Sequence, residues 1–197
     1  SSDVCSSDLS REPGTLPVPR TTCAPPSSLG TAFRLEKGAN DVATLWFDAP
    51  TTAENTLKEV YAQELEEVVS VVSRDPDIRS IVLASAKPGV FSAGFDVDLL
   101  EVGESADEAI AITRALRAAL EAIEGSSRPI VAAIDGAAYG VGCALALACH
   151  GRVASDARGT MVGFPEIRLG LTPSAGGLSR LMRVAGLRET IELAREG

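Results

Sequence analysis

The residues best suited to chemistry are a glycine-rich turn and the segment that follows it. Gly140 and Gly142 lie in the segment 136–142, immediately before an apolar run that begins at Cys143. A glycine turn that opens a helix leaves backbone N–H groups without helical acceptors at the positive end of the helix dipole, where they can stabilise negative charge. Taken alone, such a turn is more often a plain strand-to-helix connection, because glycine turns are common.

Glu166 is the candidate carboxylate, and it follows Pro165 in the segment 164–171. A positioned carboxylate can take a proton from a substrate and return it. Judged by residue type alone, a glutamate after a proline is more often a solvated surface residue. Asp96 could serve as a second acid, but aspartate readily caps its own turn, so we favour a role in structuring its loop. His150, in an apolar helix, is expected to be structural or at the solvent edge.

These candidates need elements to position them, and the apolar pattern predicts alternating strands and helices. Short apolar runs predict strands over 42–47, 78–84, 130–134 and 153–154. Recurrence of apolar residues every three or four positions, or a cap at Ser105, predicts helices over 57–72, 105–123, 143–150, 177–184 and 188–196. Loops are expected over 87–98 and 164–173. This order is the βαβ pattern of an α/β domain with a parallel sheet.

The composition limits the class of protein. With 197 residues, of which 45% are hydrophobic, the chain can bury the core of one domain. Residues 1–30 are rich in Ser, Pro and Thr, so we expect a disordered or foreign leader before a domain over 31–197. The net charge of −9 argues against a nucleic-acid partner. The sequence has no apolar run long enough for a membrane span.

The cysteines do not predict a metal site. Cys5, Cys23, Cys143 and Cys149 form no CxxC pair, and the chain has one histidine. Cys143 and Cys149 lie in an apolar stretch and are expected to be small buried residues in a reducing compartment. We therefore expect a cytoplasmic protein without a bound metal.

Three segments together carry a resemblance to a known family. They are Phe-Ser-Ala-Gly-Phe-Asp at 91–96, Gly-Ala-Ala-Tyr-Gly-Val-Gly-Cys-Ala-Leu-Ala-Leu-Ala-Cys at 136–149, and Phe-Pro-Glu-Ile-Arg-Leu-Gly-Leu at 164–171, which Pro173 and Gly176-Gly177 follow. Their order and spacing resemble the crotonase (enoyl-CoA hydratase/isomerase) superfamily over about residues 32–197. The stretch 146–153 looks most like the N-terminal domain of multifunctional fatty-acid β-oxidation enzymes. The resemblance implies a crotonase-like ββα spiral with parallel sheets and flanking helices, here without the C-terminal helical region.

The resemblance also implies a site for an acyl-CoA thioester, with no permanently bound cofactor. The backbone N–H groups of Phe95 and Val141 would form the oxyanion hole, and Glu166 would be the acid/base. The segments that would contact the substrate contain Ala93, Phe95, Asp96, Val97, Gly140, Val141 and Pro165. Members of the family commonly trimerise through C-terminal helices, so the resemblance implies a homotrimer or a multifunctional complex for the full-length protein, and a chain that stops near those helices.

Ala144 departs from the family pattern, because hydratases carry a second glutamate at this position. Asp135, Asp156 and Glu104 have no sequence support as substitutes. Water addition needs a second polar group, whereas moving a proton between two carbons needs one carboxylate. The departure favours an enoyl-CoA isomerase over a hydratase. Two alternatives stay open: a catalytically impaired acyl-CoA-binding domain of a hydratase/3-hydroxyacyl-CoA dehydrogenase, or another crotonase reaction such as thioester hydrolysis.

Overall fold

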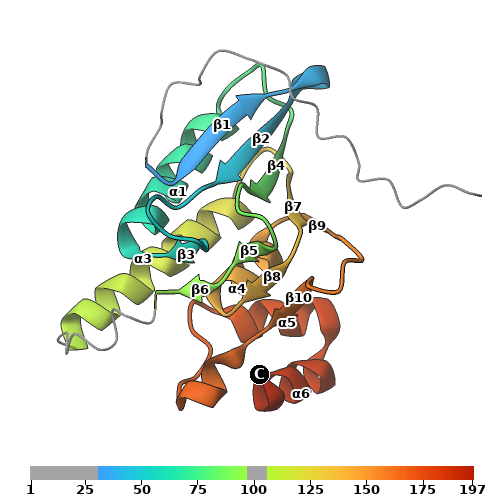
Figure 1. Cartoon of the computed structure of the whole chain (residues 1–197). Helices are drawn as coiled ribbons and strands as arrows, with labels where there is room; N and C mark the ends of the chain where they lie inside the picture. The colour runs from blue at the N-terminus through green and yellow to red at the C-terminus, as the bar shows by residue number, and fades with distance from the viewer. Residues whose placement is uncertain (1–30, 97–105) are drawn as a thin grey trace, which may run out of the picture.

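The main sheet forms the upper part of the molecule in Figure 1. The computed structural model describes residues 31–96 and 106–197, so the predicted leader 1–30, Val97, Glu104 and the Ser105 cap lie outside the described residues. The strands are β1 (Phe33–Lys37), β2 (Val42–Phe47), β4 (Ser80–Ser85), β7 (Ile130–Ile134) and β9 (Gly151–Ala154), in the order β1-β2-β4-β7-β9. β1 runs antiparallel to β2, and the other neighbours are parallel. The predicted parallel sheet is confirmed.

Two smaller sheets lie beside the main one, and they carry the candidate site. One has the order β10-β8-β5, from Met161–Gly163, Ala137–Tyr139 and Val90–Ser92. The other pairs β3 (Thr56–Leu57) with β6 (Gly94–Phe95) in parallel. Because each of these strands has only two or three residues, pairing with neighbours rather than local preference determines where they form.

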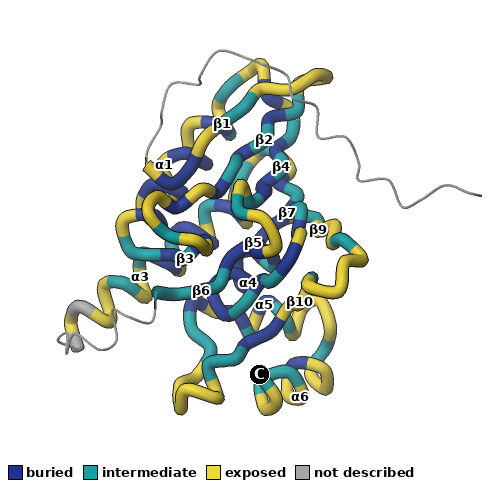
Figure 2. The backbone as a smooth tube through the Cα atoms, in the orientation of Figure 1, coloured by how far each residue is buried: buried dark blue, intermediate teal, exposed yellow. Residues whose placement is uncertain are grey.

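The helices pack around these sheets, and the buried residues line the strands and α4 (Figure 2). α1 (Glu59–Ser73) and α3 (Ala106–Glu124) pack against each other. η1 is a short 3₁₀ helix over Ala39–Asp41, between β1 and β2 in the chain. α4 (Val141–Ala148) contacts α5 (Gly177–Ala185), which leads through Gly186 into α6 (Leu187–Glu196). η2 is a 3₁₀ helix over Pro165–Leu169. In α1 the residues at helical spacing, Leu65, Val68 and Val72, are buried as predicted.

The structure corrects several predicted boundaries. Leu57 was assigned to the first helix, but it pairs with Phe95 in β3, and the helix begins at Glu59. The helix expected over 143–150 runs from Val141 to Ala148, because the glycine turn enters the helix directly. β4 begins at Ser80 instead of Ile78. The strand expected at 153–154 begins at Gly151, which pairs with Val131 of β7.

Other elements were not predicted. The segment 87–98 was expected to be a loop, but its described part contains β5 and β6, and the loop predicted over 164–173 contains η2. β1, β8 and β10 also went unpredicted. His150 is exposed, and its Nδ1 accepts a hydrogen bond from the Ile130 N–H, which agrees with the structural role expected of it. Cys143 and Cys149 are buried free thiols, as predicted. None of the described helices is long and apolar enough to cross a membrane.

Glu64 attaches the first strand to α1. It is 8% exposed, and its carboxylate accepts hydrogen bonds from the backbone N–H groups of Thr31, Ala32 and Phe33. We expect Glu64→Ala to lower the free energy of unfolding by about 2–4 kcal/mol, because buried backbone donors lose a charged acceptor. Glu67→Ala, on the exposed side of the same helix, should change it by less than about 0.5 kcal/mol. Denaturant titration measures both, and equal effects would contradict the role of Glu64.

Candidate active site

The glycine turn leads directly into α4. Gly140 has φ 53° and ψ −120°, a conformation that glycine adopts more readily than residues with a side chain. Its N–H donates to the Gly163 carbonyl at 2.9 Å, and its own carbonyl accepts from the Ala144 N–H at 3.0 Å. Val141 is the first residue of the helix, so its N–H has no acceptor within the helix and lies at the positive end of the dipole.

The loop that carries Phe95 lies directly against this turn. Gly94 has φ 100°, and a Cβ there would lie 2.7 Å from the Tyr139 carbonyl oxygen and 3.6 Å from the Val141 nitrogen. Gly142 packs on Ser92 just as closely, since its Cβ would lie 2.6 Å from the Ser92 carbonyl oxygen. The structure therefore brings together the two backbone segments that hold the predicted oxyanion donors.

Glu166 also lies against this turn. A Cβ on Gly140 would lie 2.7 Å from Glu166 Oε1 and 3.2 Å from its Cδ. The carboxylate therefore occupies space that a side chain at position 140 would fill. Oε2 is buried and has no hydrogen-bond partner among the described residues. Burial raises the pKa of the Glu166 carboxyl above its ordinary value, and a backbone hydrogen bond only partly opposes this. A carboxylate with a raised pKa can act as a base near neutral pH.

The neighbouring thiol stays protonated. Burial raises the pKa of Cys143 to about 12, with a smaller contribution from the charge of Glu166. Cys143 therefore adds no charge beside the carboxylate.

The match to a known family decides how this arrangement is understood. Residues 37–197 match the family described as enoyl-CoA hydratase/isomerase. The chain belongs to this crotonase family.

The relatives agree with this assignment. The chain is 39% identical to the fatty acid oxidation complex subunit alpha of Shewanella oneidensis, over 86% of the chain and 24% of that protein. For the same subunit of Shewanella frigidimarina the identity is 37%, again over 86% of the chain and 24% of the relative. The chain thus spans about a quarter of the length of these relatives.

Solved structures support the crotonase fold. The enoyl-CoA hydratase of Bacillus anthracis superposes with a TM-score of 0.77 at 27% identity, covering 84% of this chain and 63% of that one. A putative enoyl-CoA hydratase/isomerase family protein from Hyphomonas neptunium gives 0.75 at 31% identity, covering 85% and 63%. The predicted fold, with parallel sheets and flanking helices, is confirmed.

Ala144 lies one helical turn after Gly140 in this crotonase domain and is fully buried. Its methyl group would be 3.3 Å from a Cβ on Gly177, which also packs on the Phe164 ring. The position thus lies between α4 and the start of α5, and it supplies no carboxylate. Asp135 is exposed and accepts a hydrogen bond from Ser155, while Asp156 is exposed; Glu104 is outside the described residues.

The remaining predicted contact residues lie on the two loops already described. The Ala93 N–H donates to the Asn55 carbonyl at 2.8 Å, and Asp96 forms an ion pair with Lys58 at 3.0 Å. Pro165 begins η2 immediately before Glu166, while Val97 is not among the described residues. Sequence reasoning missed Asn55, which lies in a polar stretch with no apolar period.

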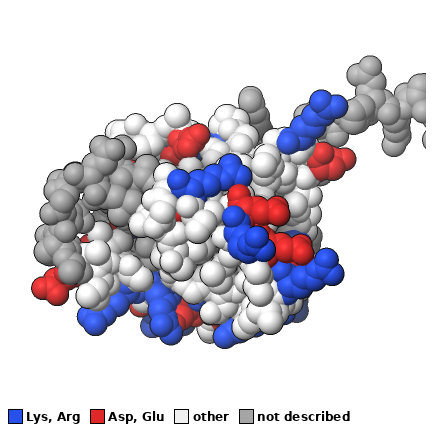
Figure 3. Space-filling model, turned by 90° about the horizontal axis from the view of Figure 1, so that it is seen from below, with Lys and Arg blue, Asp and Glu red and all other residues white. Residues whose placement is uncertain are grey.

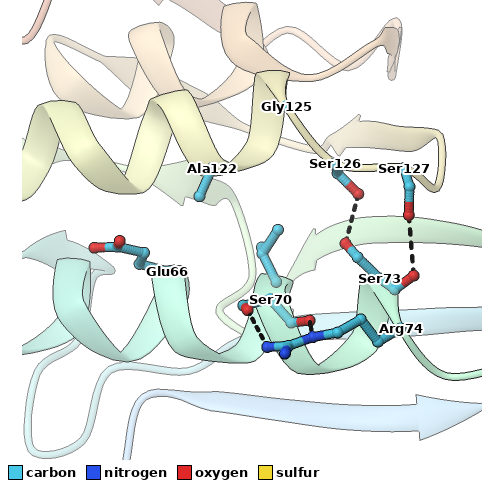
Figure 4. Close-up of a pocket in the computed structure, with 9 residues that line it drawn as sticks. Glu66, Ser70, Ser73, Arg74, Ala122, Gly125, Ser126 and Ser127 are labelled. Atoms are coloured by element: carbon cyan, nitrogen blue, oxygen red, sulfur yellow. Dashed lines mark hydrogen bonds between the residues drawn. The ribbon is translucent and has the colours of Figure 1, made fainter.

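A separate hollow of about 390 Å³ lies between the C-terminal ends of α1 and α3 (Figure 4). Its hydroxyl groups bond to one another and to backbone: Ser73 Oγ and Ser126 Oγ are 2.7 Å apart, and Ser127 Oγ donates to the Ser73 carbonyl. None of the predicted site residues lines it. These hydroxyl groups link the end of α1 to the turn that follows α3.

The face seen from below carries both signs of charge close together (Figure 3). Ion pairs also involve the last two helices, with Arg188–Glu192 within α6 and Arg183–Glu124 between α5 and α3. Arg168 of η2 donates to the Glu196 carbonyl at the end of α6, which connects the short helix that carries Glu166 to the C-terminal helix.

Among the described residues, no group of three or more His, Cys, Asp or Glu side chains is placed to hold a metal ion.

Proposed function

We propose that this domain is an enoyl-CoA isomerase that moves the double bond of an acyl-CoA thioester from C3–C4 to C2–C3, with Glu166 as its single acid/base. One observation carries the proposal. The Glu166 carboxylate lies on Gly140 beside the start of α4, while the position one turn later holds Ala144 instead of a second carboxylate.

The proposed chemistry needs only groups that this chain supplies. Glu166 takes a proton from C2 of a 3-enoyl thioester, and the electron pair moves toward the thioester oxygen to give a dienolate. The N–H groups of Phe95 and Val141 stabilise that negative charge. The protonated Glu166 then returns the same proton at C4, the double bond forms between C2 and C3, and no other reactant is consumed.

The thioester would lie along backbone rather than between charged side chains. Ala93, Asp96, Gly140 and Pro165 flank the proposed donors and base. The family resemblance adds Val97, which lies outside the described residues. Backbone contacts do not depend on side-chain type, so Phe95 and Val141 can replace the smaller residues common in the family.

Hydration is the reaction that this site supports least. Adding water to a 2-enoyl thioester needs one group to hold and activate the water and one to protonate carbon, and each positioned group contributes about 10²–10⁴-fold. Ala144 offers no such group.

Two assays on the purified protein test the proposal. A 3-enoyl-CoA should be converted to the conjugated 2-enoyl-CoA, followed by its ultraviolet absorbance, and crotonyl-CoA should be hydrated slowly or not at all. Rapid hydration of crotonyl-CoA that Glu166→Gln leaves undiminished would overturn the assignment.

A second candidate function follows from the same alanine. The domain would bind acyl-CoA for a neighbouring catalytic domain without turning it over, as in a multifunctional hydratase/dehydrogenase. Calorimetry that shows acyl-CoA binding, with no turnover of 2-enoyl or 3-enoyl substrates, would favour it. A homotrimeric or multifunctional assembly in the cytoplasm is also part of this proposal. The homotrimer comes from the family resemblance, and the relatives named as fatty acid oxidation complex subunits support the multifunctional assembly.

The raised pKa of Glu166 predicts the pH dependence of isomerisation. The base must be ionised, so kcat/KM should fall as the pH drops through the pKa of the folded carboxyl, which lies above the ordinary 4.5. A pH profile over 4–8 measures the midpoint. A midpoint at or below about 4.5 would show that burial does not control the base.

Gly140→Ala tests the contact between the turn and the carboxylate. The added methyl group would lie 2.7 Å from Glu166 Oε1 at a positive φ, so the carboxylate must move. We expect isomerase kcat to fall about 100-fold, as for a misplacement of about 1 Å. Gly89→Ala is the matched control, because Gly89 also has a positive φ but nothing lies within 4 Å of the new methyl group. Equal activity losses in the two variants would attribute the effect to backbone strain alone.

A further inference from the structure

Asn55 is a fully buried polar residue outside the proposed catalytic machinery. Its Oδ1 accepts from the Ala49 N–H at 2.8 Å, and its Nδ2 donates to the Phe47 carbonyl at 2.8 Å and to Ser85 Oγ at 3.0 Å. Phe47 and Ser85 are the last residues of β2 and β4. The side chain therefore fixes the backbone of Asn55 against the ends of two central strands.

The backbone of Asn55 in turn holds the loop that leads to Phe95. Its carbonyl accepts from Ser92 Oγ at 3.0 Å and from the Ala93 N–H at 2.8 Å. Ser92 Oγ also accepts from the Gly94 N–H at 3.3 Å, and Ser92 is fully buried. One hydroxyl group thus links Asn55 to the residue just before Phe95.

Ser92 also contacts the second segment of the proposed oxyanion hole. A Cβ on Gly142 would lie 2.6 Å from Ser92 Cβ and 2.8 Å from its Oγ, so Ser92 packs against the residue that follows Val141. β3 pairs with β6 in the register Leu57 with Phe95, which continues the connection from Asn55. Ser92 therefore lies where the two donor segments meet.

We propose that Ser92 and Asn55 are positioning residues that set the geometry of the oxyanion hole through the backbone of residues 93–95. This inference rests on the proposed function, since it assigns a cause to the placement of the Phe95 and Val141 donors. Neither side chain touches the reacting atoms. The Asn55 side chain connects the loop to the main sheet, and the Ser92 hydroxyl fixes the turn into Gly94 while its backbone and Cβ support α4.

The test uses Ser92→Ala, which removes the hydroxyl group without adding volume. Hexanoyl-CoA labelled with ¹³C at its thioester carbonyl has no double bond to move, so we expect it to bind without reacting. Infrared difference spectra then measure how far hydrogen bonds from the protein lower the stretching frequency of this carbonyl. We expect the shift seen with the unaltered protein to become smaller in Ser92→Ala. Isomerase kcat should fall about tenfold, with KM changed less than about twofold, because the lost stabilisation concerns mainly the charged state.

Ser126→Ala is the matched control. Ser126 Oγ also accepts from the N–H two residues later and donates to a backbone carbonyl, that of Arg128, but it lies in the hollow between α1 and α3. The Ser126→Ala variant should be less stable than the unaltered protein but should show the same carbonyl shift and the same kcat. Ser92→Cys keeps a weaker donor of similar size, and we expect it to give intermediate values even if Ser92→Ala folds poorly.

The outcomes separate this inference from the proposed function. Folded Ser92→Ala or Ser92→Cys with an unaltered carbonyl shift and kcat would overturn the positioning role, while the function stands. A bound thioester whose carbonyl is not shifted in the unaltered protein would instead overturn the oxyanion hole itself, and the inference with it. An equal loss of shift in Ser126→Ala would mean that general destabilisation causes the effect.

Discussion

Glu166→Gln should lower kcat for 3-enoyl-CoA isomerisation about a thousandfold while leaving acyl-CoA binding within a factor of about three. Glutamine keeps the size and one oxygen of the side chain but cannot accept and return a proton, and general acid–base catalysis by one group typically contributes about 10²–10⁴-fold. The backbone donors at Phe95 and Val141 do not depend on the charge of residue 166. The measurements are turnover by absorbance and acyl-CoA affinity by calorimetry.

The same substitution should change stability in a definite direction. Because folding raises the pKa of Glu166, the folded chain holds this proton more tightly than the unfolded chain does. The resulting stabilisation is fully present below the unfolded pKa near 4.5 and is lost as the pH rises through the folded value. Glu166→Gln should therefore melt at a higher temperature than the original protein at pH 7, and the difference should shrink below about pH 4.5.

Glu67→Gln is the control for both effects, since Glu67 is exposed on α1. It should leave turnover and the melting temperature unchanged. If Glu166→Gln retained full isomerase activity, another group would have to be the base. If it melted at a lower temperature at pH 7, the carboxylate would be a stabilising structural group.

Sequence reasoning could propose those parts of the candidate site that lie within a single segment of the chain. Glu166 directly follows a proline, and Gly140 and Gly142 lie in one short turn, so each motif can be recognised within its own segment. The order of the three motifs along the chain indicated the family. The long strands and helices could also be predicted, because each has its own apolar period. The contact between Gly94 and the Tyr139–Val141 backbone could not be predicted from the periodicity of apolar residues. It joins strands of only two or three residues, which are too short to show a period.

Leu57 and Asn55 show why the remainder was not predictable. Leu57 continues the apolar spacing of α1, yet pairing with Phe95 draws it into β3, so a non-local contact outweighs the local pattern. Asn55 lies in a polar stretch that resembles a surface turn, and its burial depends on carbonyl and N–H groups at the ends of distant strands. Such a residue is recognisable only when its hydrogen-bond partners are known.

Ala144→Glu should introduce hydration of crotonyl-CoA, raising it at least about 100-fold over the original protein. Helical side chains tilt toward the N-terminus, so a side chain at 144 extends over the turn four residues earlier. That turn is Gly140, on which the Glu166 carboxylate already rests. A glutamate at 144 would therefore bring a second carboxylate to the same place, able to hold a water that Glu166 cannot hold alone.

The substitution should also have two costs. Ala144 is fully buried near Gly177, so the larger charged side chain should lower stability by about 1–3 kcal/mol. Two neighbouring carboxylates should raise the pKa of one of them further, which would move the acid limb of the isomerase pH profile to higher pH. Denaturant titration and the pH profile measure these two effects.

Ala148→Glu separates a placed carboxylate from a merely added one. Ala148 is buried on the same helix one turn beyond Ala144, so the new charge costs stability, but the same tilt toward the N-terminus takes its side chain over Ala144, one turn short of Gly140. We expect it to destabilise the domain without hydrating crotonyl-CoA. If Ala144→Glu folds and still adds no water, a missing carboxylate is not what prevents hydration, and the limit would lie in how the loops around Phe95 and Gly177 admit water.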